Sequence, residues 1–104
     1  MRVSLGSSYN ALNGKPTCAD PGLLDGLARD TFGFTGYITG DCGAADGVWS
    51  AHHFTSTPEE AAAASMAAGM DVDCGHFVRD HLAGALSNAS VPFDDAQLDA
   101  SVAH

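Results

Sequence analysis

The sequence predicts an α/β protein with a parallel sheet. Short runs of β-forming residues alternate with longer amphipathic or alanine-rich segments, which is the order of strands and helices in such folds. The residues that end the three expected strands, Tyr9, Asp41 and Asp73, are equally spaced, and Asp-Cys-Gly occurs at the second and third of them. A period of about 31 residues fits one unit of a (β/α)8 barrel of about 250 residues. A doubly wound sheet allows the same spacing, so the periodicity leaves both architectures open.

The first expected strand and helix lie within residues 3–34. Residues 3–10 predict a short strand that runs into polar residues, and turn-forming residues follow at 13–16. Asp20 is placed to cap a helix that has Pro21 in its first turn. The apolar stripe of this helix is made of three leucines, Leu23, Leu24 and Leu27.

The second expected strand begins at Gly36 and ends at Asp41. Its interior residues, Tyr37, Ile38 and Thr39, are all β-formers. In parallel α/β proteins the carboxyl ends of the strands and the loops after them build the site, so an acid at this position is a catalytic candidate. The alternative is that Asp41 only caps the segment that follows the strand.

A second helix is predicted from the segment that starts at Thr57. We expect a loop before it, which contains Trp49, His52 and His53. Three signals coincide at the helix start, because Thr57 is a capping residue, Pro58 suits the first helical position and Glu60 suits the third. The alanine-rich run that follows ends at Gly69.

The remaining residues predict a third short strand over 70–75, a helix over 77–86 and a last helix over 94–102. Three strands and four helices cannot close a barrel or cover both faces of a parallel sheet. We therefore expect the chain to be a piece of a larger domain. The isolated polypeptide is expected to be molten or to aggregate.

The composition excludes several classes of partner. The chain has 13 acidic and 4 basic residues, a formal charge of −9 and no cluster of Lys or Arg, which excludes nucleic acid and anionic membrane surfaces. A membrane-spanning helix needs about 20 consecutive apolar residues, and no run in the sequence approaches that length. Residues 1–10 lack the apolar core of a signal peptide, so an export signal would lie outside this chain. Three cysteines without a C-x-x-C pattern leave the redox compartment open.

Five motifs in order resemble glycoside hydrolase family 3, and most closely its β-xylosidase-like branch. They are SYNALNG at 8–14, TCAD at 17–20, RDTFGF at 29–34, GYITGDCGA at 36–44 and AGMDVDCG at 68–75. The resemblance covers about residues 3–102. It implies that residues 1–104 are a fragment of the family's N-terminal (β/α)8 domain, a partial TIM barrel made of its last three βα units plus a C-terminal helix.

The resemblance assigns roles to individual residues. It implies that Asp41 is the nucleophile of a retaining glycosidase and that Tyr9 lies beside it and bounds the first sugar subsite. A core tyrosine is the alternative for Tyr9. Many β-glucosidase relatives carry Trp directly after the nucleophile, whereas this chain has Cys42, which favours the pentosidase-like branch. In the implied barrel Cys42 and Cys74 end adjacent strands, so we expect a disulfide between them and a free Cys18.

The implied activity is release of terminal β-linked sugars in the manner of a β-xylosidase or α-L-arabinofuranosidase in xylan breakdown, outside the cell. No cofactor or metal is expected, and the partner is an oligosaccharide or glycoside. Trp49 either stacks on sugar or plugs its loop against the barrel. In the family the acid/base lies in a separate C-terminal domain, and a Lys-His pair and an Arg that hold the sugar lie upstream; all are missing here. The chain alone is thus expected to be inactive. The alternatives are a non-catalytic remnant or interaction module and a small metal or redox protein.

Overall fold

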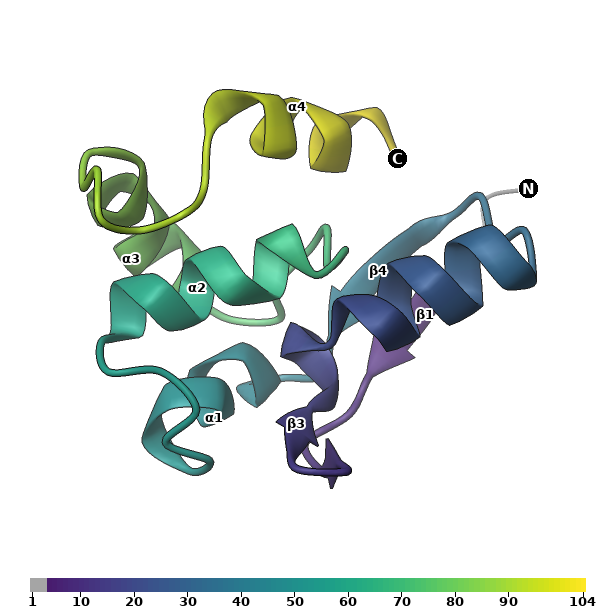
Figure 1. The fold of residues 1–104 in the computed structure, drawn as a ribbon, viewed down its shortest axis with the longest axis horizontal. Helices are drawn as coiled ribbons and strands as arrows, with labels where there is room; N and C mark the ends of the chain where they lie inside the picture. The colour runs from purple at the N-terminus through teal and green to yellow at the C-terminus, as the bar shows by residue number, and fades with distance from the viewer. Residues whose placement is uncertain (1–3) are drawn as a thin grey trace.

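A short parallel sheet forms the centre of the fold. The computed structural model describes residues 4–104, so Val3, where the first expected strand begins, lies outside the described residues. Strand β1 (Ser4–Ser7) pairs in parallel with β4 (Tyr37–Gly40), with Ser4 opposite Tyr37 and Ser7 opposite Gly40. Helix η2 (Gly22–Thr31) lies on the connection between the two strands (Figure 1). The prediction of an α/β fold is confirmed.

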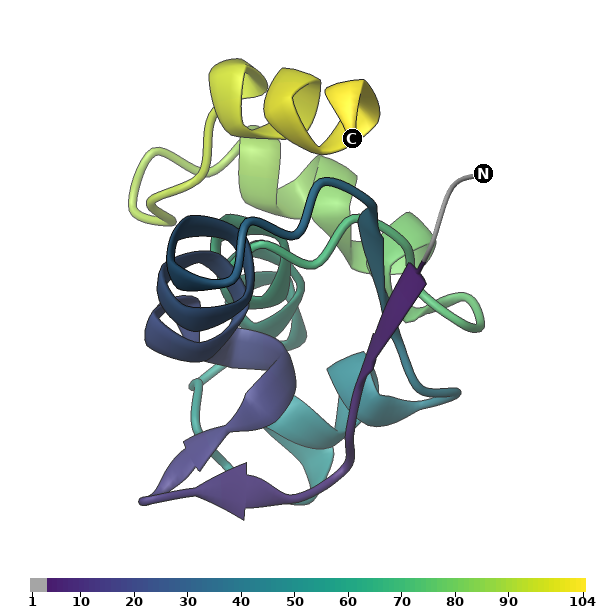
Figure 2. The same cartoon turned by 90° about the vertical axis from the view of Figure 1, so that its right-hand side faces the viewer.

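The connection from β1 to η2 also contains a small hairpin that was not predicted. Strand β2 (Ala11–Leu12) pairs antiparallel with β3 (Lys15–Pro16), and the short 3-10 helix η1 (Thr17–Ala19) follows. The expected turn is present, because Asn13 and Gly14 at its tip both have positive φ, 51° and 81°, as a tight hairpin turn requires. Figure 2 shows this hairpin projecting below the parallel strands.

Helix η2 begins as the sequence predicts but winds differently. The Asp20 carboxylate accepts hydrogen bonds from the backbone N–H groups of Gly22, at 3.0 Å, and Leu23, at 3.3 Å. The helix then runs as a π-helix from Gly22 to Thr31 instead of the expected α-helix. Leu24 is its one buried residue.

The third expected strand is reduced to a single bridge. Residues 70–75 lie beside β4, where the Gly40 N–H donates to the Val72 carbonyl at 2.8 Å, but only Thr39 and Val72 pair as strand residues. Val72 is the one strong β-former in this segment. Gly69 and Gly75 on either side have positive φ of 116° and 132°, which ends extended structure in both directions.

The loop expected around Trp49 is largely a helix. Residues Ala44–Ser50 form α1, which starts after Gly43 at a φ of 83° and places Trp49 in its last turn. Its buried face is made of small residues, Ala44, Ala45 and Val48. The sequence carries no strong start signal here, and packing of that face decides the conformation.

The other helices agree with their predicted positions. They are α2 (Pro58–Ala67), α3 (Phe77–Leu86) and α4 (Asp95–Ala103). At the start of α2, Thr57 and Glu60 exchange side-chain to backbone hydrogen bonds, both at 3.2 Å, which is the predicted capping box. None of the helices within residues 4–104 is long and apolar enough to cross a membrane.

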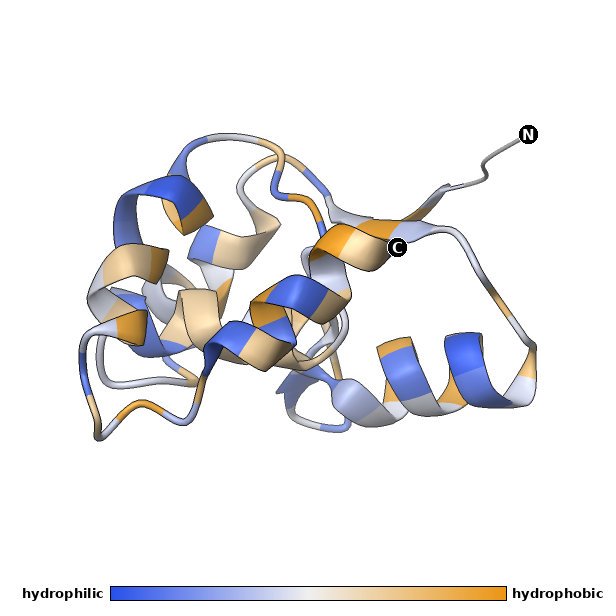
Figure 3. Cartoon of the chain, turned by 90° about the horizontal axis from the view of Figure 1, so that it is seen from above, coloured by the Kyte–Doolittle hydropathy of each residue, from blue (hydrophilic) through white to orange (hydrophobic). Residues whose placement is uncertain are grey.

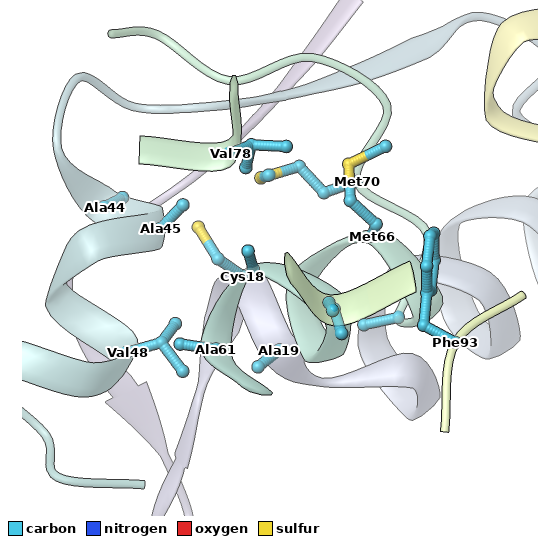
Figure 4. Packing of buried hydrophobic residues seen from close by; sticks show 14 of the residues in the cluster. Cys18, Ala19, Ala44, Ala45, Val48, Ala61, Met66, Met70, Val78 and Phe93 are labelled. Carbon is cyan, nitrogen blue, oxygen red and sulfur yellow. The ribbon is translucent and has the colours of Figure 1, made fainter. Parts of the chain in front are cut away.

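Helix α2 is the central helix of the fold. It contacts α1, α3, α4 and η1, and its buried alanines let these neighbours approach closely. The core between them is built mainly from small and sulfur-containing side chains (Figure 4), among them Cys18, Val48, Ala61, Met66 and Met70.

A buried ion pair ties three segments together at the start of β4. The Asp71 carboxylate, whose side chain is 2% exposed, accepts from Arg29 at 2.6 Å, from the Ile38 N–H at 2.9 Å and from His104 at 2.8 Å. Arg29 also donates to the carbonyls of Gly36, at 2.9 Å, and Gly69, at 3.2 Å. This pair lies at the opposite end of β4 from Asp41 and holds η2, β4 and the segment after α2 in place.

Replacing Asp71 is expected to destabilise the protein strongly. Asp71→Ala leaves the buried Arg29 charge without its main partner, and loss of one partner of a buried pair costs about 3 kcal/mol or more of unfolding free energy. Asp80→Ala is the matched control, because Asp80 forms an exposed pair with Arg79 and its loss leaves stability almost unchanged. Urea unfolding of the full-length protein measures both. Equal stability of the two variants would contradict this role of Asp71.

Candidate active site

Asp41 lies directly after β4, at the carboxyl end of the parallel strands. Its backbone N–H donates to the Ser7 carbonyl at 2.9 Å, which continues the ladder between β4 and β1 by one bond. Its side chain is exposed, and Oδ1 accepts from the Cys42 N–H at 2.7 Å. Its carbonyl accepts from the Ala44 N–H at 2.8 Å, at the start of α1. The carboxylate is therefore fixed by backbone on both sides and faces solvent.

Tyr9 comes from the end of the neighbouring strand and reaches the same place. Its phenol donates to the Cys42 carbonyl at 2.8 Å, one residue beyond Asp41. The residue is 55% exposed, so it is not a core tyrosine. Partial loss of water raises the pKa of the Tyr9 phenol, and hydrogen bonding and the negative charge of the nearby Asp41 raise it further. The sheet thus brings together the two residues that the sequence analysis selected.

A hollow of about 330 Å³ opens at this edge of the sheet. Its walls come from the ends of both strands and from the disulfide described below. The lining residues are Gly6, Ser7, Ser8, Thr39, Gly40, Asp41, Cys42 and Cys74. The volume lies at the lower end of the range of ligand sites, about 300–1,000 Å³.

A disulfide forms one wall of the hollow. Cys42 and Cys74 are joined, with their Cα atoms 4.4 Å apart. The Gly43 N–H also donates to the Cys74 carbonyl at 3.2 Å. The segment that carries Asp41 is therefore connected to the end of the third strand-like segment by a covalent bond and a hydrogen bond.

Cys18 is a free, buried cysteine. Burial raises the pKa of its thiol, a hydrogen bond with Ser7 lowers it, and the negative charges of Asp73 and Asp41 raise it further. Its sulfur lies among the apolar side chains of the core (Figure 4) and contacts the Ser7 hydroxyl. A thiol in such surroundings stays protonated in the folded protein at neutral pH.

Trp49 is not brought to this hollow. It lies on α1 and is 38% exposed. Among residues 4–104, those that line the hollow do not include Trp49. Its role as a sugar-stacking residue stays a prediction. Across the same part of the chain, no group of three or more His, Cys, Asp or Glu side chains is arranged to hold a metal ion. His81 on α3 pairs with one carboxylate alone, its Nδ1 lying 3.2 Å from Glu59 Oε1.

His52 and His53 follow the segment that carries Asp41, so the sequence allows either a contact with the site or plain solvation, but it does not predict the contact with Tyr9 that His52 makes. Its ring Nε2 lies 2.6 Å from the Tyr9 carbonyl oxygen. The contact depends on where α1 ends, and α1 itself was not predicted. No pattern in the sequence signals it.

The fold and the site together describe an α/β protein of a recognisable kind. An exposed carboxylate, a tyrosine and a hollow lie at the carboxyl end of its parallel strands. The family model for the glycosyl hydrolase family 3 N-terminal domain matches residues 3–104. The chain therefore belongs to glycoside hydrolase family 3.

Named relatives agree with this assignment. The chain is 42% identical over 102 residues, 98% of its length, to "Beta-xylosidase/alpha-L-arabinofuranosidase 1" of Medicago sativa subsp. varia. It is 48% identical over 84 residues, 81% of its length, to "Beta-D-xylosidase 3" of Arabidopsis thaliana. A solved GH3 exo-beta-xylosidase in complex with a xylobiose aziridine activity-based probe is similar over 96% of the chain, with a TM-score of 0.88 and 40% identity. The chain spans 13%, 11% and 13% of the lengths of these three proteins.

The contact between Ser7 and Cys18 yields a prediction. In Ser7→Cys a second sulfur replaces the hydroxyl that contacts the Cys18 thiol, so we expect a disulfide that closes a short loop and adds about 3 kcal/mol to the stability. Ser7→Ala serves as the control. Thiol titration and thermal unfolding with and without reductant measure the effect. A Ser7→Cys variant whose two thiols both remain titratable under oxidising conditions would contradict the prediction.

Proposed function

We propose that this chain carries the nucleophile of a retaining glycosidase that releases terminal β-linked pentoses. The observation that supports the proposal most is the exposed Asp41 carboxylate at the carboxyl end of β4, with the Tyr9 phenol close to it. The named relatives are xylosidases or combined xylosidase/arabinofuranosidases, which favours β-D-xylosides and α-L-arabinofuranosides as substrates.

The proposed chemistry uses two steps. In the first, a carboxylate oxygen of Asp41 bonds to the anomeric carbon while the bond to the leaving glycosidic oxygen breaks and that oxygen takes a proton from an acid. In the second, water attacks the same carbon, the ester bond to Asp41 breaks and the carboxylate is regenerated. The Cys42 N–H, 2.7 Å from Oδ1, fixes the orientation of the carboxylate.

We place the acid/base outside this chain. A retaining enzyme needs a second carboxyl group about 5–5.5 Å from the nucleophile. The two acids within residues 70–75 have structural contacts, since Asp71 binds Arg29 and Asp73 accepts from the Val78 N–H at 3.0 Å. We assign the acid/base to a following domain and the sugar-binding Lys-His pair and Arg to preceding units.

The same proposal assigns the chain to the last three βα units of a (β/α)8 barrel plus a C-terminal helix. Several apolar side chains beside β1 are uncovered, since Leu5 is 41%, Leu27 42% and Phe32 76% exposed. They line an open groove of about 230 Å³ between β1 and η2, and η2 is coloured in hydrophobic and hydrophilic bands in Figure 3. A preceding βα unit would pair with the free edge of β1 and cover these side chains.

The proposed enzyme acts outside the cell on xylan-derived oligosaccharides. The alternative is a non-catalytic remnant or interaction module that keeps the barrel motifs without the acid/base and the upstream sugar-binding residues. The two differ in whether the full-length product hydrolyses xylosides.

Covalent labelling tests the proposed nucleophile. A 2-fluoro xyloside with a good leaving group should label the full-length protein on the peptide that contains Asp41, as seen by mass spectrometry. Asp41→Asn should lose the label, and kcat should fall by at least about 10³-fold, because removal of a covalent nucleophile costs that much or more. Asp46→Asn, a carboxylate change on the adjacent α1, is the control and keeps both. Labelling of another residue would refute the assignment.

The isolated 104-residue chain tests the proposed incompleteness. With the edge of β1 free and Leu5, Leu27 and Phe32 exposed, it should bind a hydrophobic dye, elute as aggregate or expanded species and lack a sharp thermal transition. Calorimetry and size-exclusion chromatography measure this. A monomer with cooperative unfolding would contradict the prediction.

A further inference from the structure

His52 donates a hydrogen bond to the backbone of Tyr9. Its ring Nε2 lies 2.6 Å from the Tyr9 carbonyl oxygen, and a carbonyl only accepts, so Nε2 carries the hydrogen. The backbone of His52 is held at the end of α1, because its N–H donates to the Gly47 carbonyl at 2.9 Å. His52, which follows helix α1, is therefore bonded to the segment after β1 that carries Tyr9.

This bond differs from the others that hold the same turn. The carbonyl of Ser8 accepts from the Thr17 hydroxyl at 2.5 Å, and the carbonyl of Asn10 accepts from the Thr17 N–H at 3.1 Å. Both bonds are local to the segment between β1 and η1. Within residues 4–104, the bond from the His52 side chain to the Tyr9 carbonyl instead links this turn to the segment that follows α1.

The bond is the first in a chain of hydrogen bonds that leads from His52 to the nucleophile. His52 holds the Tyr9 backbone, the Tyr9 phenol donates to the Cys42 carbonyl at 2.8 Å, and the Cys42 N–H donates to Asp41 Oδ1 at 2.7 Å. Tyr9 is 55% exposed, so packing alone does not fix it and hydrogen bonds at both of its ends do.

We propose that His52 is a positioning residue for the glycosidase reaction, acting through Tyr9 to fix the orientation of the Asp41 carboxylate. The role of His52 in activity rests on the proposed function, whereas its effect on the order of the turn does not. His52 does not line the hollow and acts without touching the sugar.

The first test compares three variants of the full-length protein with 4-nitrophenyl β-D-xyloside as substrate. His52→Leu removes the donor and should lower kcat/KM about tenfold, the usual effect of losing one hydrogen bond. His52→Gln keeps an N–H donor at similar reach and should retain activity within about twofold of the wild type. His53→Asn is the neighbouring control, since His53 is exposed and its φ of 51° suits asparagine. Equal loss in His52→Gln and His52→Leu would overturn the proposed hydrogen-bonding role.

The second test does not need activity. Hydrogen exchange followed by mass spectrometry should show faster exchange in His52→Leu at residues 8–18 and 41–44, with little change in α2 and α3. His52→Gln and His53→Asn should match the wild type. Unchanged exchange in both segments of His52→Leu overturns the inference, even when activity falls. A wild-type protein that hydrolyses no xyloside refutes the proposed function, and the exchange data still decide whether His52 orders the turn.

Discussion

The parallel alignment of β1 and β4 is the constraint on which the site depends. Because the strands run in the same direction and in register from Ser4 opposite Tyr37, their carboxyl ends meet at one edge. The ladder continues past the last residue of β4 through the bond from the Asp41 N–H to the Ser7 carbonyl. The Asp41 carboxylate therefore lies at the same edge of the sheet as Tyr9, which comes shortly after β1. A change in the register of the two strands would separate these side chains without altering either of them.

The residues at the two ends of β4 have different roles, one structural and one at the candidate site. At its start, the buried pair of Asp71 and Arg29 joins η2 to the segment after α2. At its end, Asp41 is exposed, and the disulfide between Cys42 and Cys74 restrains the loop that carries it. A similar division is known in (β/α)8 barrels, where the carboxyl ends of the strands carry the chemistry and the opposite ends contribute stability.

Much of this organisation was predictable from local sequence, and the exceptions have physical reasons. The helix start at Thr57 was clear because capping is a local interaction, and the placement of Asp41 followed from the β-formers before it. Helix α1 was not predicted because burial of its face of small residues stabilises it. That burial depends on distant parts of the chain and leaves no signal in the local sequence. Residues 70–75 were assigned too much strand because a lone Val72 between two positive-φ glycines supports only one bridge. The contact of His52 with Tyr9 depends on α1 and was therefore invisible as well.

The central claim is that Asp41 bonds covalently to a sugar on the same rim of the sheet that carries Tyr9. Membership of the family does not by itself assign that role to this chain, because chemistry resides in the site and not in the fold. A crystal structure of the full-length protein after reaction with a 2-fluoro xyloside tests it most directly. We expect continuous electron density from the Asp41 carboxylate to the anomeric carbon, with the Tyr9 phenol beside the sugar. Density that joins the sugar to a different carboxylate, or that places Tyr9 on the opposite rim, would contradict the account.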